Sequence, residues 1–181
     1  MARAVGSGAV TDGTGAPGGA FDDLLAANQE YAAGFSLQGL EARAGRGLAL
    51  LTCMDSRIEP LAMLGLRPGD AKILRNAGGR VTDDVLRTLA LGAHLLGVTR
   101  VLVVPHTRCR MTGREEDLHA ALRERSGMDT RSLELRTTED VREGLRRDLQ
   151  RIRSWPYLPS GLPVAGAVYD VDTGRVEPLE E

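Results

Sequence analysis

Three side chains that commonly bind metal ions follow two short apolar runs of this sequence. Cys53 closes the run Leu48–Cys53, while His106 and Cys109 follow the run 101–104. Unbroken apolar runs of this length are typical of strands buried on both faces of a parallel sheet. The carboxyl ends of such strands meet at one crevice, so the three side chains can converge there. Thiolate and imidazole suit Zn²⁺, and two cysteines with one histidine leave a fourth tetrahedral position open, as in catalytic zinc sites.

Each of these residues also has a simpler interpretation. A cysteine at the end of a buried strand is usually a small core residue, and a histidine there is often a hydrogen-bonded loop residue. The combination favours the metal site, because both cysteines of the chain fall at strand ends and one lies in an H-x-x-C spacing. Asp55 and Arg57 follow Cys53 at spacings of two, so their side chains can reach the same pocket.

Composition narrows the class of protein. The chain has 181 residues, a size suited to one domain with a core that needs no disulfides. Its net charge of −2 argues against a nucleic-acid-binding protein, which usually has a basic excess. No apolar run is long enough to span a bilayer or to form the core of a signal peptide. We therefore expect a cytoplasmic protein with no membrane partner, in which the thiols are reduced.

The remaining pattern alternates between strands and helices, which predicts an α/β domain with a mostly parallel central sheet flanked by helices. Residues 1–19 are rich in glycine and poor in large apolar side chains, so a flexible tail is expected before a domain over 20–181. Strands are predicted at 48–53, 71–74 and 101–104 and a closing hairpin at 164–171 and 175–179, with helices at 21–35, 83–96, 118–125 and 138–153.

Three segments together resemble the β-class carbonic anhydrases, most closely the short bacterial members. They are C-M-D-S-R at 53–57, R-N-A-G at 75–78 and H-T-R-C at 106–109, in the order found in that family. The likeness runs from about Phe21 to the C-terminus. It implies a Zn²⁺ cofactor bound by Cys53, His106 and Cys109, and a catalytic pair formed by Asp55 and Arg57. It also implies a homodimer or higher homo-oligomer, in which the helix over 21–35 can dock on a second subunit.

The resemblance further implies the reaction, which is the reversible hydration of CO₂ to bicarbonate and a proton. Zinc lowers the pKa of bound water towards ~7, so that hydroxide attacks the carbon of CO₂ at neutral pH. Asp55 is expected to accept a hydrogen bond from that hydroxide, and Arg57 to hold Asp55 away from the metal. Without Arg57, Asp55 is expected to become the fourth ligand and close the site.

One position departs from the family pattern, because Arg110 stands where family members commonly have glycine after the second cysteine. A positive φ at Arg110 would cost roughly 1–2 kcal/mol. Arg108 and Arg110 also raise the local positive potential. We expect one of them to pair with a nearby acid, either Asp83, Asp84 or Glu115.

Other functions stay open at this point. Related folds hydrolyse CS₂ or COS, and a diverged zinc-binding homologue with weak or no hydratase activity would account for Arg110. A redox role for Cys53 and Cys109 would require a reversible disulfide. We expect His94 and His119 to lie outside the active site. The glycines of the segment 75–79 are expected to let the backbone approach the crevice closely.

Overall fold

A computed structural model describes residues 19–180, so most of the predicted tail lies outside the described residues. The chain divides into two compact units. The first ends at Gln38 and the second begins at Gly39, and each is described by itself. Within the described residues, no helix is both long and apolar enough to cross a membrane.

The first unit contains a single described helix, α1 (Asp22–Ala33), which confirms the helix predicted over 21–35. Asp22 and Asp23 lie in its first turn, where the helix dipole favours negative charge. No residue of α1 is buried, although the segment carries many large apolar side chains. Those exposed by more than two fifths are Phe21, Leu24, Leu25, Tyr31 and Phe35.

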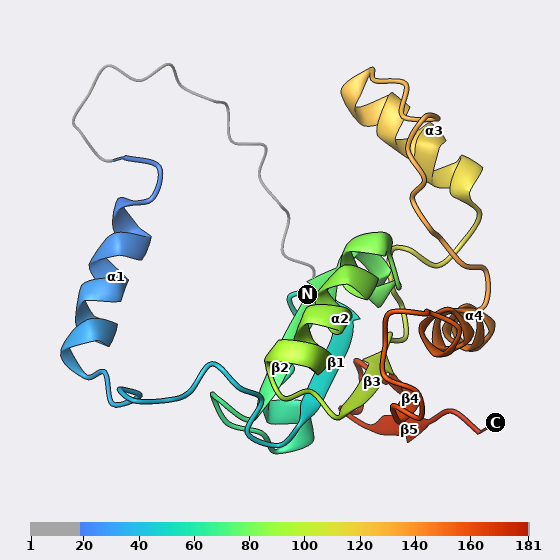
Figure 1. The fold of residues 1–181 in the computed structure, drawn as a ribbon. Coiled ribbons are helices and arrows are strands. Elements are labelled where there is room, and N and C mark those ends of the chain that lie inside the picture. The colour runs from blue at the N-terminus through green and yellow to red at the C-terminus, as the bar shows by residue number, and fades with distance from the viewer. Residues whose placement is uncertain (1–18, 181) are drawn as a thin grey trace. The chain divides into compact units, whose positions relative to one another are not determined.

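The second unit is built on a five-stranded sheet with the strand order β2-β1-β3-β4-β5 (Figure 1). The first four strands in this order pair in parallel, and β5 pairs antiparallel with β4 at the edge. The mostly parallel α/β prediction is therefore confirmed. The strands are β1 (Leu48–Cys53), β2 (Ala71–Asn76), β3 (Arg100–Val104), β4 (Val164–Tyr169) and β5 (Val176–Pro178).

The central strand β1 is buried along its whole length, as its unbroken apolar sequence predicts. Its alternate residues enter two different clusters, because successive side chains of a strand point to opposite faces. Ala49 and Leu51 belong to the larger cluster, and Leu48 and Leu50 to the smaller one. The sheet thus has a core on each side, and β1 is held in one register.

Helices α2 (Asp83–Leu95) and α4 (Val141–Arg153) fill the larger cluster on the same side of the sheet. Thr82 caps α2 as predicted, accepting a hydrogen bond from the Val85 amide at 3.3 Å. The predicted start of α4 at residue 138 is wrong by three residues. Asp140 is the N-cap of this helix, because its carboxylate accepts a hydrogen bond from the Glu143 amide at 2.9 Å.

The remaining elements are short or exposed. A 3₁₀ turn, η1 (Ala62–Leu64), borders the smaller cluster, and a second one, η2 (Ala77–Gly79), follows β2. Helix α3 (Glu115–Ser126) lies away from the sheet and buries none of its residues (Figure 1). It starts before its predicted residue 118, because three acidic residues at its beginning favour the positive end of the helix.

A buried ion pair ties the segment after η2 to α4. Arg80 Nε lies 2.6 Å from Asp148 Oδ2, and the two side chains are only 12% and 8% exposed. The same guanidinium donates to the carbonyls of Arg136 and Thr137 at 2.9 and 3.3 Å. The charge of Arg80 is therefore satisfied on all sides, and nothing in the sequence pattern predicts this pairing.

We expect Asp148→Ala to destabilise the fold by about 3–5 kcal/mol, because it leaves the Arg80 charge buried without a partner. Urea unfolding checks this value. Asp84→Ala is the matched control, because the side chains of the Arg87–Asp84 pair are 65% and 75% exposed and its loss is expected to cost less than about 1 kcal/mol. Equal losses in the two variants would contradict the account of the buried pair.

Candidate active site

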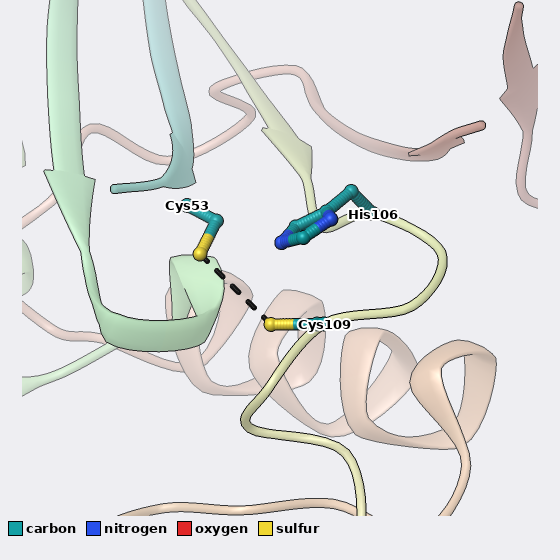
Figure 2. A group of neighbouring side chains, drawn as sticks. All are labelled: Cys53, His106 and Cys109. Carbon is teal, nitrogen blue, oxygen red and sulfur yellow. Dashed lines mark hydrogen bonds between the residues drawn. The ribbon is translucent and has the colours of Figure 1, made fainter. Parts of the chain in front are cut away.

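The three predicted metal ligands converge at the carboxyl edge of the sheet (Figure 2). Cys53 is the last residue of β1, and His106 and Cys109 lie in the loop that follows β3. Because β1 and β3 are parallel neighbours, both chain exits lie at the same edge. One donor atom from each residue lies within 4.8 Å of the other two, and the two sulfur atoms are 3.9 Å apart.

The imidazole of His106 carries a buried nitrogen that needs a partner. The residue is fully buried, and its Nδ1 lies 2.9 Å from the Thr107 carbonyl oxygen. Its Nε2 has no hydrogen-bond partner among the described residues. A buried polar atom left alone is unfavourable, so its position beside two thiols fits a cation ligand. Two sulfurs bound to one tetrahedral Zn²⁺ are about 3.8 Å apart, close to the spacing seen here.

The surrounding backbone favours negative charge on the two sulfurs. The Gly78 amide donates to Cys53 Sγ at 3.3 Å, and the Met111 amide donates to Cys109 Sγ at 3.5 Å. The hydrogen bond from the Cys109 thiol is the main cause that lowers the pKa of Cys53 well below its usual range. That same bond, together with burial, raises the pKa of Cys109. A dication binds the two sulfurs as thiolates, so its binding would release the protons that they carry.

The predicted close approach of the backbone is found at Gly78 and Gly79. Both have positive φ, at 79° and 64°. A Cβ on Gly79 would lie 3.0 Å from the carbonyl carbon of Thr52, so no larger residue fits there without movement of β1. The Asn76 side chain closes this turn with two hydrogen bonds to the Arg80 backbone, at 2.7 and 2.8 Å.

Asp55 and Arg57 form the expected pair beside the three donors. Arg57 Nε and Nη2 donate to the two carboxylate oxygens of Asp55 at 2.9 and 2.7 Å, a bidentate arrangement. These bonds hold the pKa of Asp55 far below its usual range, so it stays a carboxylate at any pH near neutrality. Asp55 Oδ2 also lies 3.8 Å from His106 Nε2, so one side of the pair faces the donors.

Arg75 positions this loop in a way that the sequence pattern did not predict. Its guanidinium donates to the Cys53 carbonyl at 2.9 Å and to the Asp55 carbonyl at 2.7 Å. The strand β2 extends two residues beyond its predicted end at 74, which brings Arg75 beside Thr52 in the register. An arginine near the end of a strand, next to a strand that carries a ligand, was the available signal.

Comparisons with known proteins agree with this geometry. The family model described as carbonic anhydrase matches residues 48–176. β-Carbonic anhydrase 1 of Mycobacterium tuberculosis is 38% identical over 157 residues, covering 86% of this chain and 94% of that protein. The chain belongs to the β-class carbonic anhydrase family.

The chain is also similar to a solved carbonic anhydrase structure and to an enzyme with a different printed activity. The crystal structure of carbonic anhydrase from Streptococcus mutans superposes with a TM-score of 0.83 at 37% identity, covering 88% of this chain and 97% of that one. A carbon disulfide hydrolase of Saccharolobus solfataricus is 32% identical over 155 residues, covering 72% of this chain and 76% of that protein.

The left-handed residue of the loop between His106 and Met111 is Arg108 and not Arg110. Among the described non-glycine residues, only Arg108 and Arg136 have positive φ, so the condition for strain at Arg110 is not met. The left-handed residue is Arg108, with φ of 52°, where the loop reverses between His106 and Cys109. Holding an arginine in this conformation costs roughly 1–2 kcal/mol.

The predicted ion-pair partners for these two arginines are also wrong. Arg108 Nη2 lies 2.5 Å from Asp172 Oδ1 in the turn between β4 and β5. The three acids expected to pair are used elsewhere: Asp83 by Arg151, Asp84 by Arg87, and Glu115 by the Leu135 amide and His119. The order of strands in a parallel sheet leaves no local mark on the sequence, so the position of β4 beside β3, which brings Asp172 to Arg108, was not predictable.

The other two histidines make contacts outside the site, as expected. His94 Nε2 lies 2.9 Å from the Tyr157 carbonyl oxygen, and His119 Nδ1 lies 2.8 Å from Thr130 Oγ1. Neither belongs to the metal-ligand group found among the described residues.

We expect Arg57→Ala to move Asp55 onto a zinc ion bound at this site. The substitution removes both guanidinium bonds from a carboxylate that already lies beside His106, and a free carboxylate is a good zinc ligand. A crystal structure of the zinc-loaded variant checks this. Arg87→Ala, which breaks an exposed pair that does not include any of the three donors, is the control. An Arg57→Ala structure in which Asp55 stays off the metal would contradict the prediction.

Proposed function

We propose that this chain catalyses the reversible hydration of CO₂ to bicarbonate and a proton, with Zn²⁺ held by Cys53, His106 and Cys109. The observation that carries the proposal is the unpartnered, fully buried His106 Nε2 beside two thiols, with a carboxylate 3.8 Å away. Membership of the carbonic anhydrase family supports it. We assign the activity to residues 20–181.

The proposed roles divide between metal ligands and the charged pair. When bound, zinc supplies the Lewis acidity that makes hydroxide available near neutral pH. Cys53, His106 and Cys109 would hold the ion, and a set of three protein ligands would leave room for the reacting oxygen. Asp55, ionised at these pH values, accepts a hydrogen bond and orients the attacking oxygen. Arg57 keeps that carboxylate in place, since its bidentate bonds fix both carboxylate oxygens.

Asp55→Ala is expected to lower the rate of CO₂ hydration by roughly 10²-fold, because one positioned hydrogen-bond acceptor is lost while the ligands remain. Stopped-flow hydration, with the zinc content measured on the same sample, checks this. The control Asp84→Ala is expected to keep the full rate.

A zinc-loaded wild-type chain that does not hydrate CO₂ at any pH would overturn the proposed reaction. Hydrolysis of CS₂ by that same sample would assign the chain to the carbon disulfide hydrolase branch. Binding of zinc without either activity would assign it as a diverged zinc-binding homologue.

We also propose that the chain works as a homodimer or higher homo-oligomer. α1 is twelve residues long and buries none of them, and a helix this short is marginal in water without a packing partner. Its segment exposes a row of large apolar residues, with the rings of Tyr31 and Phe35 in contact at 5.7 Å. Exposed apolar clusters of this kind are typical of protein–protein contacts.

Replacing Leu24 and Leu25 by glutamate is expected to shift the assembly towards the monomer mass of 19.4 kDa, because two charges enter the apolar row. Sedimentation velocity at micromolar concentration measures the shift. Asn28→Glu on the same helix is the control for added charge. A wild-type chain that sediments as a monomer would refute the proposal.

The compartment that we propose is the cytoplasm. Cys53 and Cys109 are free thiols 3.9 Å apart, and an oxidising compartment would favour a disulfide between them over metal binding. Cell fractionation tests this, and recovery of the protein from an oxidising compartment would contradict it.

A further inference from the structure

The loop that carries His106 and Cys109 is attached to the turn between β4 and β5. The Thr107 amide donates to the Tyr169 carbonyl at 2.9 Å, and the Val171 amide donates to Thr107 Oγ1 at 3.2 Å. One step further along, Arg108 Nη2 pairs with Asp172 Oδ1 at 2.5 Å. Three successive contacts thus join two neighbouring exits of the sheet.

The turn that presents Asp172 is itself well ordered by local hydrogen bonds. The Asp170 carboxylate accepts from the backbone amides of Asp172 and Thr173, at 2.8 and 2.9 Å. The Asp170 amide donates to the Arg175 carbonyl at 2.8 Å. Asp172 is therefore held by a fixed turn, and its pairing with Arg108 anchors the loop at a defined place.

The backbone of Arg108 reaches the other half of the active site. Its carbonyl oxygen accepts a hydrogen bond from Arg57 Nη2 at 3.3 Å. This is the same nitrogen that donates to Asp55 Oδ2 at 2.7 Å. The direction of the Arg108 carbonyl depends on its left-handed conformation, with φ of 52°. A strained residue that faces a charged pair points to a positioning role.

We propose that Arg108 is a positioning residue for the Asp55–Arg57 pair. Its ion pair with Asp172 keeps the backbone of Arg108 left-handed, and in that conformation its carbonyl holds the Arg57 guanidinium against Asp55. The inference rests on the proposed function, because it concerns the pair that keeps Asp55 off the metal. It assigns to Arg108 and Asp172 a contribution that the zinc-ligand motifs do not contain.

Two single variants and one double variant test this arrangement. Asp172→Ala removes the anchor from an exposed turn, and Arg108→Ala removes the ion pair and leaves a residue that, like arginine, disfavours left-handed φ. The double variant Arg108→Asp/Asp172→Arg restores the pair with its charges exchanged. Arg131→Ala is the control, because it breaks an ion pair of similar exposure with Asp129.

The first readout is CO₂ hydration. Each single variant is expected to lower kcat/KM by about three- to fivefold, the range of an exposed ion pair, and the double variant to return within about twofold of wild type. The control is expected to keep the wild-type rate.

The second readout does not use CO₂. Cobalt(II) replaces zinc, and the visible absorption is followed as thiocyanate is added, since an anion binds only where the fourth position is open. The single variants are expected to give a smaller spectral change at saturation, because Asp55 then occupies that position in part of the molecules. The double variant is expected to recover the change.

Wild-type spectra and rates in both single variants would overturn the proposal. So would lower rates with an unchanged response to thiocyanate, because these indicate a general effect on the loop. If the wild-type chain does not hydrate CO₂, the proposed function fails, while the cobalt spectra still decide the role of Arg108.

Discussion

Two thiols and a bare imidazole nitrogen placed within 4.8 Å of one another inside a protein form an arrangement that is unfavourable without a cation. The rest of this fold can be understood as the support that it needs. The parallel sheet brings the exits of β1 and β3 to one edge, and β1 is fixed in register by cores on both faces. Backbone amides after β2 and after Cys109 donate to the sulfurs and so favour their thiolate form.

A carboxylate beside such a cation must be kept from binding it. Asp55 lies close enough to His106 to become a ligand, and its two bonds from Arg57 oppose this. The guanidinium in turn touches the Arg108 carbonyl, and Arg108 is anchored at Asp172. In the proposed mechanism, activity on a small uncharged substrate depends on a series of polar contacts near the surface, each weak alone, arranged around the three donors.

The sequence predicted those features that depend on local pattern. The unbroken apolar runs indicated β1 and β3, and their parallel exits placed Cys53, His106 and Cys109 together. Contacts between distant charged residues were not predictable, since any of 22 arginines could pair with many acids. The Arg80–Asp148 pair was therefore missed, and Arg108 was given the wrong partners. The left-handed conformation of Arg108 was not predicted, because no local signal marks an arginine for the place where the loop reverses before Cys109.

The most direct test of the central claim is stopped-flow CO₂ hydration by the purified full chain, with zinc measured on the same sample. The account predicts zinc near one per chain, hydration at neutral pH, and loss of both zinc and activity when His106 is replaced by alanine. A chain that holds no zinc, or that hydrates CO₂ equally well without His106, would contradict the claim that these three donors form the catalytic metal site.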